Sequence, residues 1–370
     1  MAKKLMQLLL VFGCLIFAAW GIAYVKKSGM FEPYPSAEYL SDEEQQSRPL
    51  YQQLTGEEKA IYTALYRGIS EHEEKIALPF EIDGETYAKL YCILEKQEGG
   101  LFYIDSTFYT AEKIRTAKVL YRNDSENDYT TMAHELEMIA DNVVSRIPSS
   151  DFDKALYIHD YIVNNCSYGI NEGESYDATA YGCLVEKSAH CEGYAKAFEY
   201  LAEKAGLECI VVTGTTDDGE NHAWNQVEID GNWYNVDVTW DDTDIESDKR
   251  HMYFLVNDND FLVTHFAASD IFAPFKCVST DESYFIKENL YISSVSDADD
   301  ILNYAVANGE DFIELKFAND DVYSEFKSIY IEGEKIFFII MESGSPILSQ
   351  SLEISLKENE KERCMMIFLQ

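Results

Sequence analysis

The sequence predicts an α+β fold, and two observations lead to that class. Apolar residues recur at three- and four-residue spacing in several segments before residue 206, as in helices that bury one face. Short runs rich in β-branched and aromatic residues follow from Cys209 onward, as in strands. The 370 residues are enough for two or three domains, and the 46% apolar content is enough to build their cores.

The chain is strongly acidic, with a formal net charge of −38. Such a surface repels the phosphates of nucleic acids, so no nucleic-acid partner is expected. None of the eight cysteines forms a C-x-x-C pair, and their spacing is irregular. We therefore expect neither a disulfide framework nor a zinc site, and most of the cysteines are predicted to be small buried residues.

Residues 1–27 are predicted to form an N-terminal membrane anchor or signal. Lysine pairs flank an apolar run of 21 residues from Leu5 to Val25, which is broken only by Gln7. That length spans a bilayer as a helix, whereas a cleaved signal peptide usually has a shorter apolar core. The expected location is therefore the cell membrane, with a single N-terminal anchor and the rest of the chain extracytoplasmic. A secreted protein is the alternative, and a structural lipoprotein, which depends on Cys14 alone, is a third.

A linker at residues 28–48 leads into a mostly helical N-terminal segment at residues 49–147. The linker contains two prolines and an acidic stretch, whereas Ile61, Leu65 and Ile69 recur on one face of a helix. This segment is expected to pack on the domain that comes after it in the chain, and no catalytic chemistry is visible in it. Further elements predicted there are strands at Tyr91–Leu94 and Leu101–Ile104 and a helix at Tyr129–Arg146.

Cys191 is predicted to open a helix within residues 148–268. Good helix formers continue from it to Gly206, a suitable C-terminal stop. The run Ser149-Ser150-Asp151 is expected to cap an earlier helix that continues through Asn164. The apolar residues of the later helix share one face with Cys191. The helix dipole stabilises a thiolate at this position, and the free N–H groups there can stabilise an oxyanion. Taken alone, a buried structural cysteine is the simpler interpretation.

A hairpin is predicted to bring a histidine beside a carboxylate. Asp230-Gly231 is a strong two-residue turn signal between strands at His222–Ile229 and Trp233–Thr239. With that turn, His222 and Asp237 are diagonal neighbours on one face, with backbones about 7–8 Å apart. A carboxylate on one imidazole nitrogen leaves the other nitrogen free to deprotonate a thiol. Taken alone, His222 or Asp237 could equally be an ordinary polar residue of a strand without a catalytic role.

These motifs, read together, resemble the bacterial branch of the transglutaminase-like superfamily. The resemblance implies a papain-like core and a catalytic domain at residues 148–268. It further implies that Cys191 is the nucleophile, His222 the base and Asp237 the carboxylate that orients the base. The stretches that carry the resemblance are Ala180–Leu184, Ala189–Ala195, Asn221–Asn225 and Trp233–Asp242, with further similarity at His159–Tyr161 and His251–Leu255.

Two departures from the family pattern lie close to Cys191. His190 stands where the family often has a small aliphatic residue, and it either perturbs the thiolate or faces solvent, of which we prefer solvent. Some family members use an upstream indole in the oxyanion hole, but no tryptophan lies between Trp20 and Trp224. The backbone N–H of Cys191 is therefore one candidate donor, and Tyr181 is a weaker one.

Residues 269–370 are predicted to form a small C-terminal α+β module without a catalytic constellation. An acidic loop at Asp241–Asp248 has the oxygen ligands that calcium prefers, but it lacks the fixed spacing of a calcium loop, so a solvated loop is favoured. No cofactor is expected. The elements predicted in the module are strands at Leu290–Ser293, Phe312–Phe317, Ile336–Met341, Leu352–Leu356 and Met365–Leu369 and a helix at Ala298–Asn308.

The predicted function is cysteine-dependent acyl transfer or hydrolysis on amide bonds of protein or peptide substrates. The acyl group passes either to an amine or to water, and hydrolysis is slightly favoured. The alternative is a non-catalytic cell-surface binding or scaffolding module that retains the fold.

Overall fold

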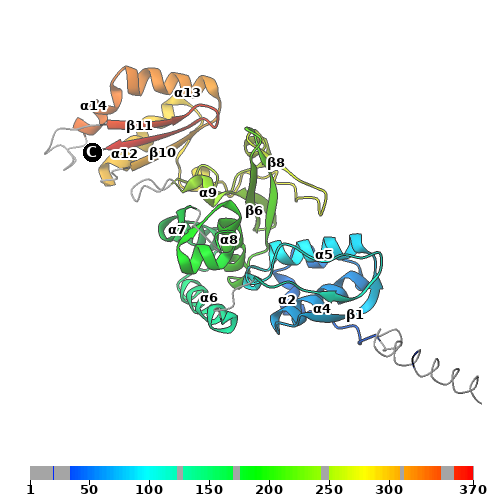
Figure 1. Ribbon diagram of the computed structural model, residues 1–370. Helices are drawn as coiled ribbons and strands as arrows, with labels where there is room; N and C mark the ends of the chain where they lie inside the picture. Colours follow the sequence, from blue (N-terminus) through cyan, green and yellow to red (C-terminus); the bar gives the residue numbers. More distant parts are fainter. Residues whose placement is uncertain are drawn as a thin grey trace, which may run out of the picture.

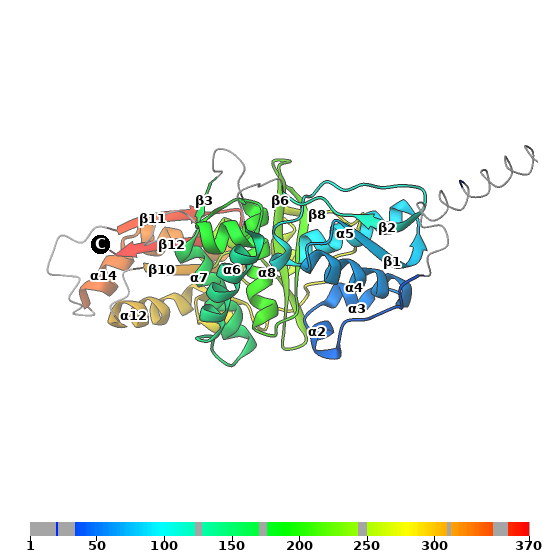
Figure 2. The same ribbon diagram turned by 60° about the horizontal axis from the view of Figure 1, so that its bottom comes forward.

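The computed structural model describes Trp20 and residues 34–122, 128–169, 176–242, 250–308, 312–342 and 354–369. Helices and strands both occur along the chain, which confirms the α+β class. Figures 1 and 2 show three parts that follow one another in chain order. The first part is blue to cyan, the central part green to yellow, and the last part orange to red.

The first part combines helices with a two-stranded antiparallel sheet. Thr55 caps α4 (Gly56–Ser70) through reciprocal hydrogen bonds with Glu58. The predicted apolar face of α4 is buried in the core. The other elements of this part are α2 (Asp42–Gln46), α3 (Pro49–Gln53) and α5 (Gly84–Gln97), with β1 (Lys75–Ile82) paired to β2 (Ile114–Lys118).

The strands predicted at Tyr91–Leu94 and Leu101–Ile104 are wrong. The first run lies inside α5, and the second begins at the end of a 3-10 turn, η1 (Gly99–Leu101). Ile104 makes only an isolated bridge. A four-residue apolar run has no readable period, whereas the buried side chains of α5 have helical spacing over the whole element. These are Tyr87, Leu90, Tyr91, Ile93 and Leu94.

In the central part, α8 (Cys191–Lys204) packs against an antiparallel sheet with the order β7-β6-β5-β8. Gly206, at a φ of +78°, follows the end of α8 as predicted. The helices α6 (Tyr129–Val144) and α7 (Asp151–Asn165) also form as predicted. The strands of the sheet are β5 (Cys209–Thr216), β6 (Asn221–Ile229), β7 (Asn232–Val236) and β8 (His265–Ala267). Short elements are β3 (Ser167–Tyr168), η2 (Gly182–Glu186), β4 (Ser188–Ala189), α9 (Val238–Asp241) and α10 (Asp258–Phe261).

The hairpin of β6 and β7 forms in the predicted register, with Ile229 opposite Asn232. Asp230 and Gly231 both have positive φ angles, 50° and 84°, as a type I′ turn requires. The strand predicted to continue through Thr239 is too long, because β7 ends at Val236 and the chain turns into α9.

The last part has its own hydrophobic core and a four-stranded sheet with the order β11-β12-β10-β9. The strand predicted at Ile336–Met341 is wrong, because this run forms α14 (Lys335–Glu342). Burial of Ile336, Ile339 and Ile340 follows helical spacing despite their β-branched side chains. The remaining elements are α11 (Tyr284–Lys287), β9 (Tyr291–Ile292), η3 (Val295–Asp297), α12 (Ala298–Asn308), β10 (Phe312–Phe317), α13 (Asp320–Phe326), η4 (Lys327–Glu332), β11 (Ile354–Asn359) and β12 (Cys364–Leu369).

The prediction of a cell-membrane location with a single N-terminal anchor needs correction. None of the helices in the described part of the chain is both long and apolar enough to cross a bilayer. The longest of them, α6, has 16 residues, whereas a span needs about 20 apolar residues. The predicted anchor at residues 1–27 lies, apart from Trp20, outside the described residues.

Candidate active site

Cys191 is the first residue of α8, and its side chain is partly buried. It packs against a small apolar cluster of Ala195, Val211 and Ala223, which comes from α8 and the sheet. As the first helical residue, Cys191 has a backbone N–H without an acceptor inside the helix. The thiol therefore lies beside the positive end of the helix, where a thiolate is stabilised.

The β6–β7 hairpin brings His222 next to Asp237. The Nε2 atom of His222 lies 2.7 Å from Oδ2 of Asp237, and both side chains are buried. The other oxygen of Asp237, Oδ1, accepts hydrogen bonds from the backbone N–H groups of Thr239 and Trp240 and so caps α9. One carboxylate thus orients the imidazole and starts the next helix, which restricts its rotation.

The charges of the three groups favour a thiolate beside an imidazolium. Burial opposes ionisation of Cys191, but hydrogen bonds and charge from His190 and His222 lower the pKa of the thiol to about 6. Burial likewise opposes protonation of His222, but the charge and hydrogen bond of Asp237 raise its pKa to about 10. Burial also opposes ionisation of Asp237, but the charge and hydrogen bond of His222 hold the pKa of that carboxyl well below its usual range.

His190 does not simply face solvent, which corrects the preferred interpretation of this residue. Its side chain is half-buried, and its interaction with the thiol of Cys191 is the largest cause of its raised pKa. Two imidazoles, His190 before α8 and His222 on β6, thus act to lower the pKa of the Cys191 thiol.

His265 is a member of the site that the motifs did not reveal. Its Nε2 atom lies 3.0 Å from Oδ2 of Asp237, the oxygen that also bonds His222. Its Nδ1 atom lies 2.9 Å from the hydroxyl of Thr264, and the imidazole is fully buried. Because His265 comes from β8, beyond the hairpin, no local pattern pointed to it.

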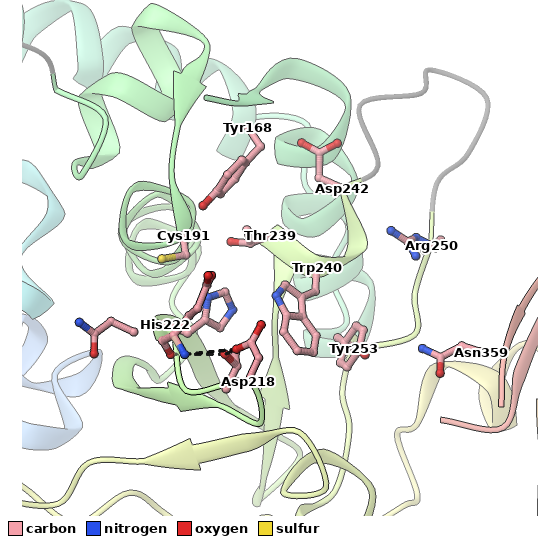
Figure 3. A pocket seen from close by; sticks show the side chains of 13 residues that line it. Tyr168, Cys191, Asp218, His222, Thr239, Trp240, Asp242, Arg250, Tyr253 and Asn359 are labelled. Carbon is pink, nitrogen blue, oxygen red and sulfur yellow. Dashed lines mark hydrogen bonds between the residues drawn. The ribbon is translucent and has the colours of Figure 1, made fainter. Parts of the chain in front are cut away.

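A cavity of about 470 Å³ opens beside Cys191 and His222 (Figure 3). Figure 3 shows the ring of Tyr168 above the thiol, with its hydroxyl directed toward Cys191. The remaining lining residues are Thr216, Asp218, Glu220, Asn221, Thr239, Trp240, Asp242, Arg250, Tyr253 and Asn359. The cavity thus places aromatic and acidic groups next to Cys191.

Tyr181, the weaker oxyanion candidate, lies elsewhere. Its hydroxyl donates to Glu135 at 3.1 Å, its ring stacks on Phe102, and it does not line the cavity. Tyr181 therefore lies away from the cavity beside Cys191, whereas Tyr168 lines it. Tyr168 lies in β3, outside the stretches that carry the family resemblance, so none of those motifs includes it.

The acidic loop at Asp241–Asp248, which was expected to be solvated, lies mostly outside the described residues. Within the described part, Asp241 accepts hydrogen bonds from the backbone N–H of Tyr253 and lies 3.1 Å from Nε2 of His159. Its carboxylate is fully buried. Asp241 therefore belongs to the interior and not to a solvated loop.

Comparison with known proteins confirms the family resemblance for one segment. Residues 137–238 match the family model of the transglutaminase-like superfamily. An alignment over 130 residues, which covers 31% of this chain and 20% of the relative, is 31% identical to "Kyphoscoliosis peptidase" of Mus musculus. The chain thus spans about a fifth of the length of this curated relative.

Two solved structures are also similar to parts of the chain. The crystal structure of a TGase is 20% identical, with a TM-score of 0.27, over 32% of this chain and 34% of that chain. A putative cysteine protease from Cytophaga hutchinsonii is 22% identical, with a TM-score of 0.27, over 36% of this chain and 40% of that chain.

Proposed function

Starting from the transglutaminase-like segment at residues 137–238, we propose that the chain is a cysteine-dependent enzyme that cleaves amide bonds of protein or peptide substrates. Cys191 is the nucleophile, His222 the general base and acid, and Asp237 the carboxylate that orients His222. The observation that carries the proposal is the lowered pKa of a thiol that opens on a cavity beside a buried His–Asp pair.

The reaction begins when the Cys191 thiolate attacks the carbonyl carbon of the substrate amide. The negative charge that forms on the carbonyl oxygen is stabilised by the backbone N–H of Cys191 and by the hydroxyl of Tyr168. The C–N bond breaks as the His222 imidazolium gives its proton to the leaving amine. A thioester on Cys191 and a free amine result.

The second half of the reaction removes the acyl group. Neutral His222 takes a proton from water, and the resulting oxygen nucleophile attacks the thioester carbonyl. The C–S bond then breaks, which releases a carboxylic acid and restores the Cys191 thiolate and the His222 imidazolium. The similarity to a curated peptidase supports water over an amine as the acceptor.

The pH dependence of alkylation by iodoacetamide tests the proposal. Mass spectrometry of tryptic peptides measures the rate at Cys191 and at Cys92, another partly exposed thiol, whose pKa is raised by burial. The rate at Cys191 should rise through a pH of about 6, because only the thiolate reacts, and should exceed that at Cys92 near neutral pH.

Two variants make this test sharper. His222→Ala should shift the Cys191 transition to higher pH, whereas His134→Ala, on the exposed face of α6, should leave it unchanged. If Cys191 reacts no faster than Cys92 and His222→Ala changes nothing, the catalytic proposal fails. The non-catalytic binding module would then take its place.

A further inference from the structure

A second group of titratable side chains lies away from Cys191. His159 and Asp160 come from α7, and His251 comes from the segment that follows α9. Oδ1 of Asp160 lies 3.1 Å from Nδ1 of His159 and 3.0 Å from Nε2 of His251. The ligand atoms of these three residues all lie within 4.8 Å of one another.

Each histidine of this group also has an outer carboxylate. Nε2 of His159 lies 3.1 Å from Oδ2 of Asp241, and Nδ1 of His251 lies 3.2 Å from Oε2 of Glu314. Glu314 belongs to β10, so the group joins the central part of the molecule to the last part. Apart from the partly exposed Asp160, all of these side chains are buried.

The geometry of the group separates inner atoms from outer ones. Nδ1 of His159 and Nε2 of His251 converge on the carboxylate of Asp160, while the other nitrogen of each ring lies beside an outer carboxylate. The two ring centroids are 5.1 Å apart. With a divalent cation among the inner atoms, each neutral ring would ligate through one nitrogen and donate from the other to its outer carboxylate, a pattern common around protein-bound zinc.

We propose that Nδ1 of His159, a carboxylate oxygen of Asp160 and Nε2 of His251 bind one divalent transition-metal ion, best matched by Zn²⁺. Asp241 and Glu314 orient the two rings. Zinc–ligand distances of about 2.0–2.1 Å place tetrahedral ligand atoms roughly 3.3 Å apart. The two ring nitrogens lie 3.1 and 3.0 Å from Oδ1 of Asp160 and within 4.8 Å of each other, in the range that a shared ion requires.

Access and charge agree with such a site. The side chain of Asp160 is 35% exposed, and His251 lines a cavity of about 1010 Å³, so a metal ion and a water ligand can enter. The group contains three carboxylates, and the ion pairs described for them are to the two histidines alone. The inference does not depend on the proposed reaction at Cys191.

Zinc binding to the full chain tests the proposal. The Cys191→Ser background is used, because a reactive thiol can bind zinc itself. After treatment with EDTA and dialysis, calorimetric titration with Zn²⁺ should show one ion per chain, and substituted Co²⁺ should give the visible absorption of a tetrahedral site. His222→Asn, which breaks the separate His222–Asp237–His265 group, should retain this stoichiometry.

Two conservative variants decide the location of the metal. Asp160→Asn should abolish the tight site, and Glu314→Gln should weaken Zn²⁺ binding about 10- to 100-fold, as expected for loss of an outer carboxylate. Far-ultraviolet circular dichroism should show that both variants are folded. The proposal is overturned if the parent chain binds no zinc, or if His222→Asn removes the ion while Asp160→Asn retains it.

Discussion

At the scale of single residues, Asp237 contacts two imidazoles and the start of a helix with one carboxylate. Oδ2 is hydrogen-bonded to His222 and His265, and Oδ1 accepts hydrogen bonds from backbone N–H groups in the first turn of α9. A carboxylate with partners on both oxygens cannot rotate without breaking several hydrogen bonds, so the orientation of His222 is set before a substrate arrives. His265 is thus expected to act as a positioning residue.

Two replacements of His265 distinguish the effect of its hydrogen bond from the effect of its side-chain volume. His265→Met removes the donor to Asp237, and loss of a hydrogen bond to a charged group costs about 1.5–3 kcal/mol. If that cost appears in the transition state, kcat should fall roughly 10- to 100-fold with little change in KM. His265→Gln retains an amide donor and should recover most of the rate. Steady-state kinetics on a peptide amide would measure both, and equal losses in the two variants would contradict a positioning role.

How much of the site could be predicted depends on how local each contact is. Cys191 depends on a helix start, and the His222–Asp237 pair depends on a two-residue turn, so both could be derived from neighbouring residues. Tyr168 and His265 lie at the site because β3 and β8 pack there. The positions of these two strands depend on contacts between residues far apart in the sequence, which no local pattern encodes.

At the scale of elements, the turn at Asp230-Gly231 controls the register that pairs β6 with β7. A Cβ atom on Gly231 would have space, since the nearest atom is Oε1 of Glu228 at 3.9 Å. The constraint is conformational, because the φ of +84° lies in the left-handed region. A one-residue slip of this hairpin would turn His222 away from Asp237.

Gly231→Ala should therefore destabilise the chain through backbone strain alone. The expected loss in the free energy of unfolding is about 1–2 kcal/mol, the cost of placing a Cβ in the left-handed region. Gly56→Ala, in the first turn of α4 with open space around the new Cβ, serves as the control and should not destabilise. Urea unfolding midpoints would measure both, and equal midpoints would show that the turn relaxes without cost.

Two of the elements that were predicted wrongly share a physical cause. Tyr91–Leu94 and Ile336–Met341 are short apolar runs, and such runs are compatible with a buried strand or a buried helix. In the structure both form helices, because tertiary packing buries side chains at helical spacing. By contrast, α8 has a long periodic face and a glycine stop, so its bounds could be predicted closely.

At the scale of the whole molecule, the first part is joined to α8 by a buried charge cluster. Arg48 lies 2.8 Å from Glu98 and 2.6 Å from Glu203 of α8, and its side chain is only 10% exposed. Burial and the neighbouring charge of Glu98 outweigh the opposing effect of Arg48 and raise the pKa of Glu203 to about 7. Removal of the arginine would leave these carboxylates without their cation.

Arg48→Met should lower the free energy of unfolding by about 3–5 kcal/mol, because unpaired buried charges are costly. Arg67→Met is the matched control, since Arg67 pairs with Glu44 at a site where the arginine is 50% exposed. That change should cost about 0–1 kcal/mol. Chemical denaturation of the two variants gives the comparison, and similar losses would mean that the Arg48 cluster contributes no more than a surface pair.

The helix α9 is only four residues long, yet both of its ends are held. Asp237, which caps its start, is hydrogen-bonded to His222, and Asp241 at its end is hydrogen-bonded to His159. The ring of His251, next to that of His159, is hydrogen-bonded to Glu314 in β10. A fragment of the gene that stops after the segment matching the family would retain all three proposed catalytic residues. It would nevertheless lose His251, His265 and Glu314. The smallest fragment expected to retain activity therefore extends through the strand that carries Glu314, well beyond the boundary that similarity alone would choose.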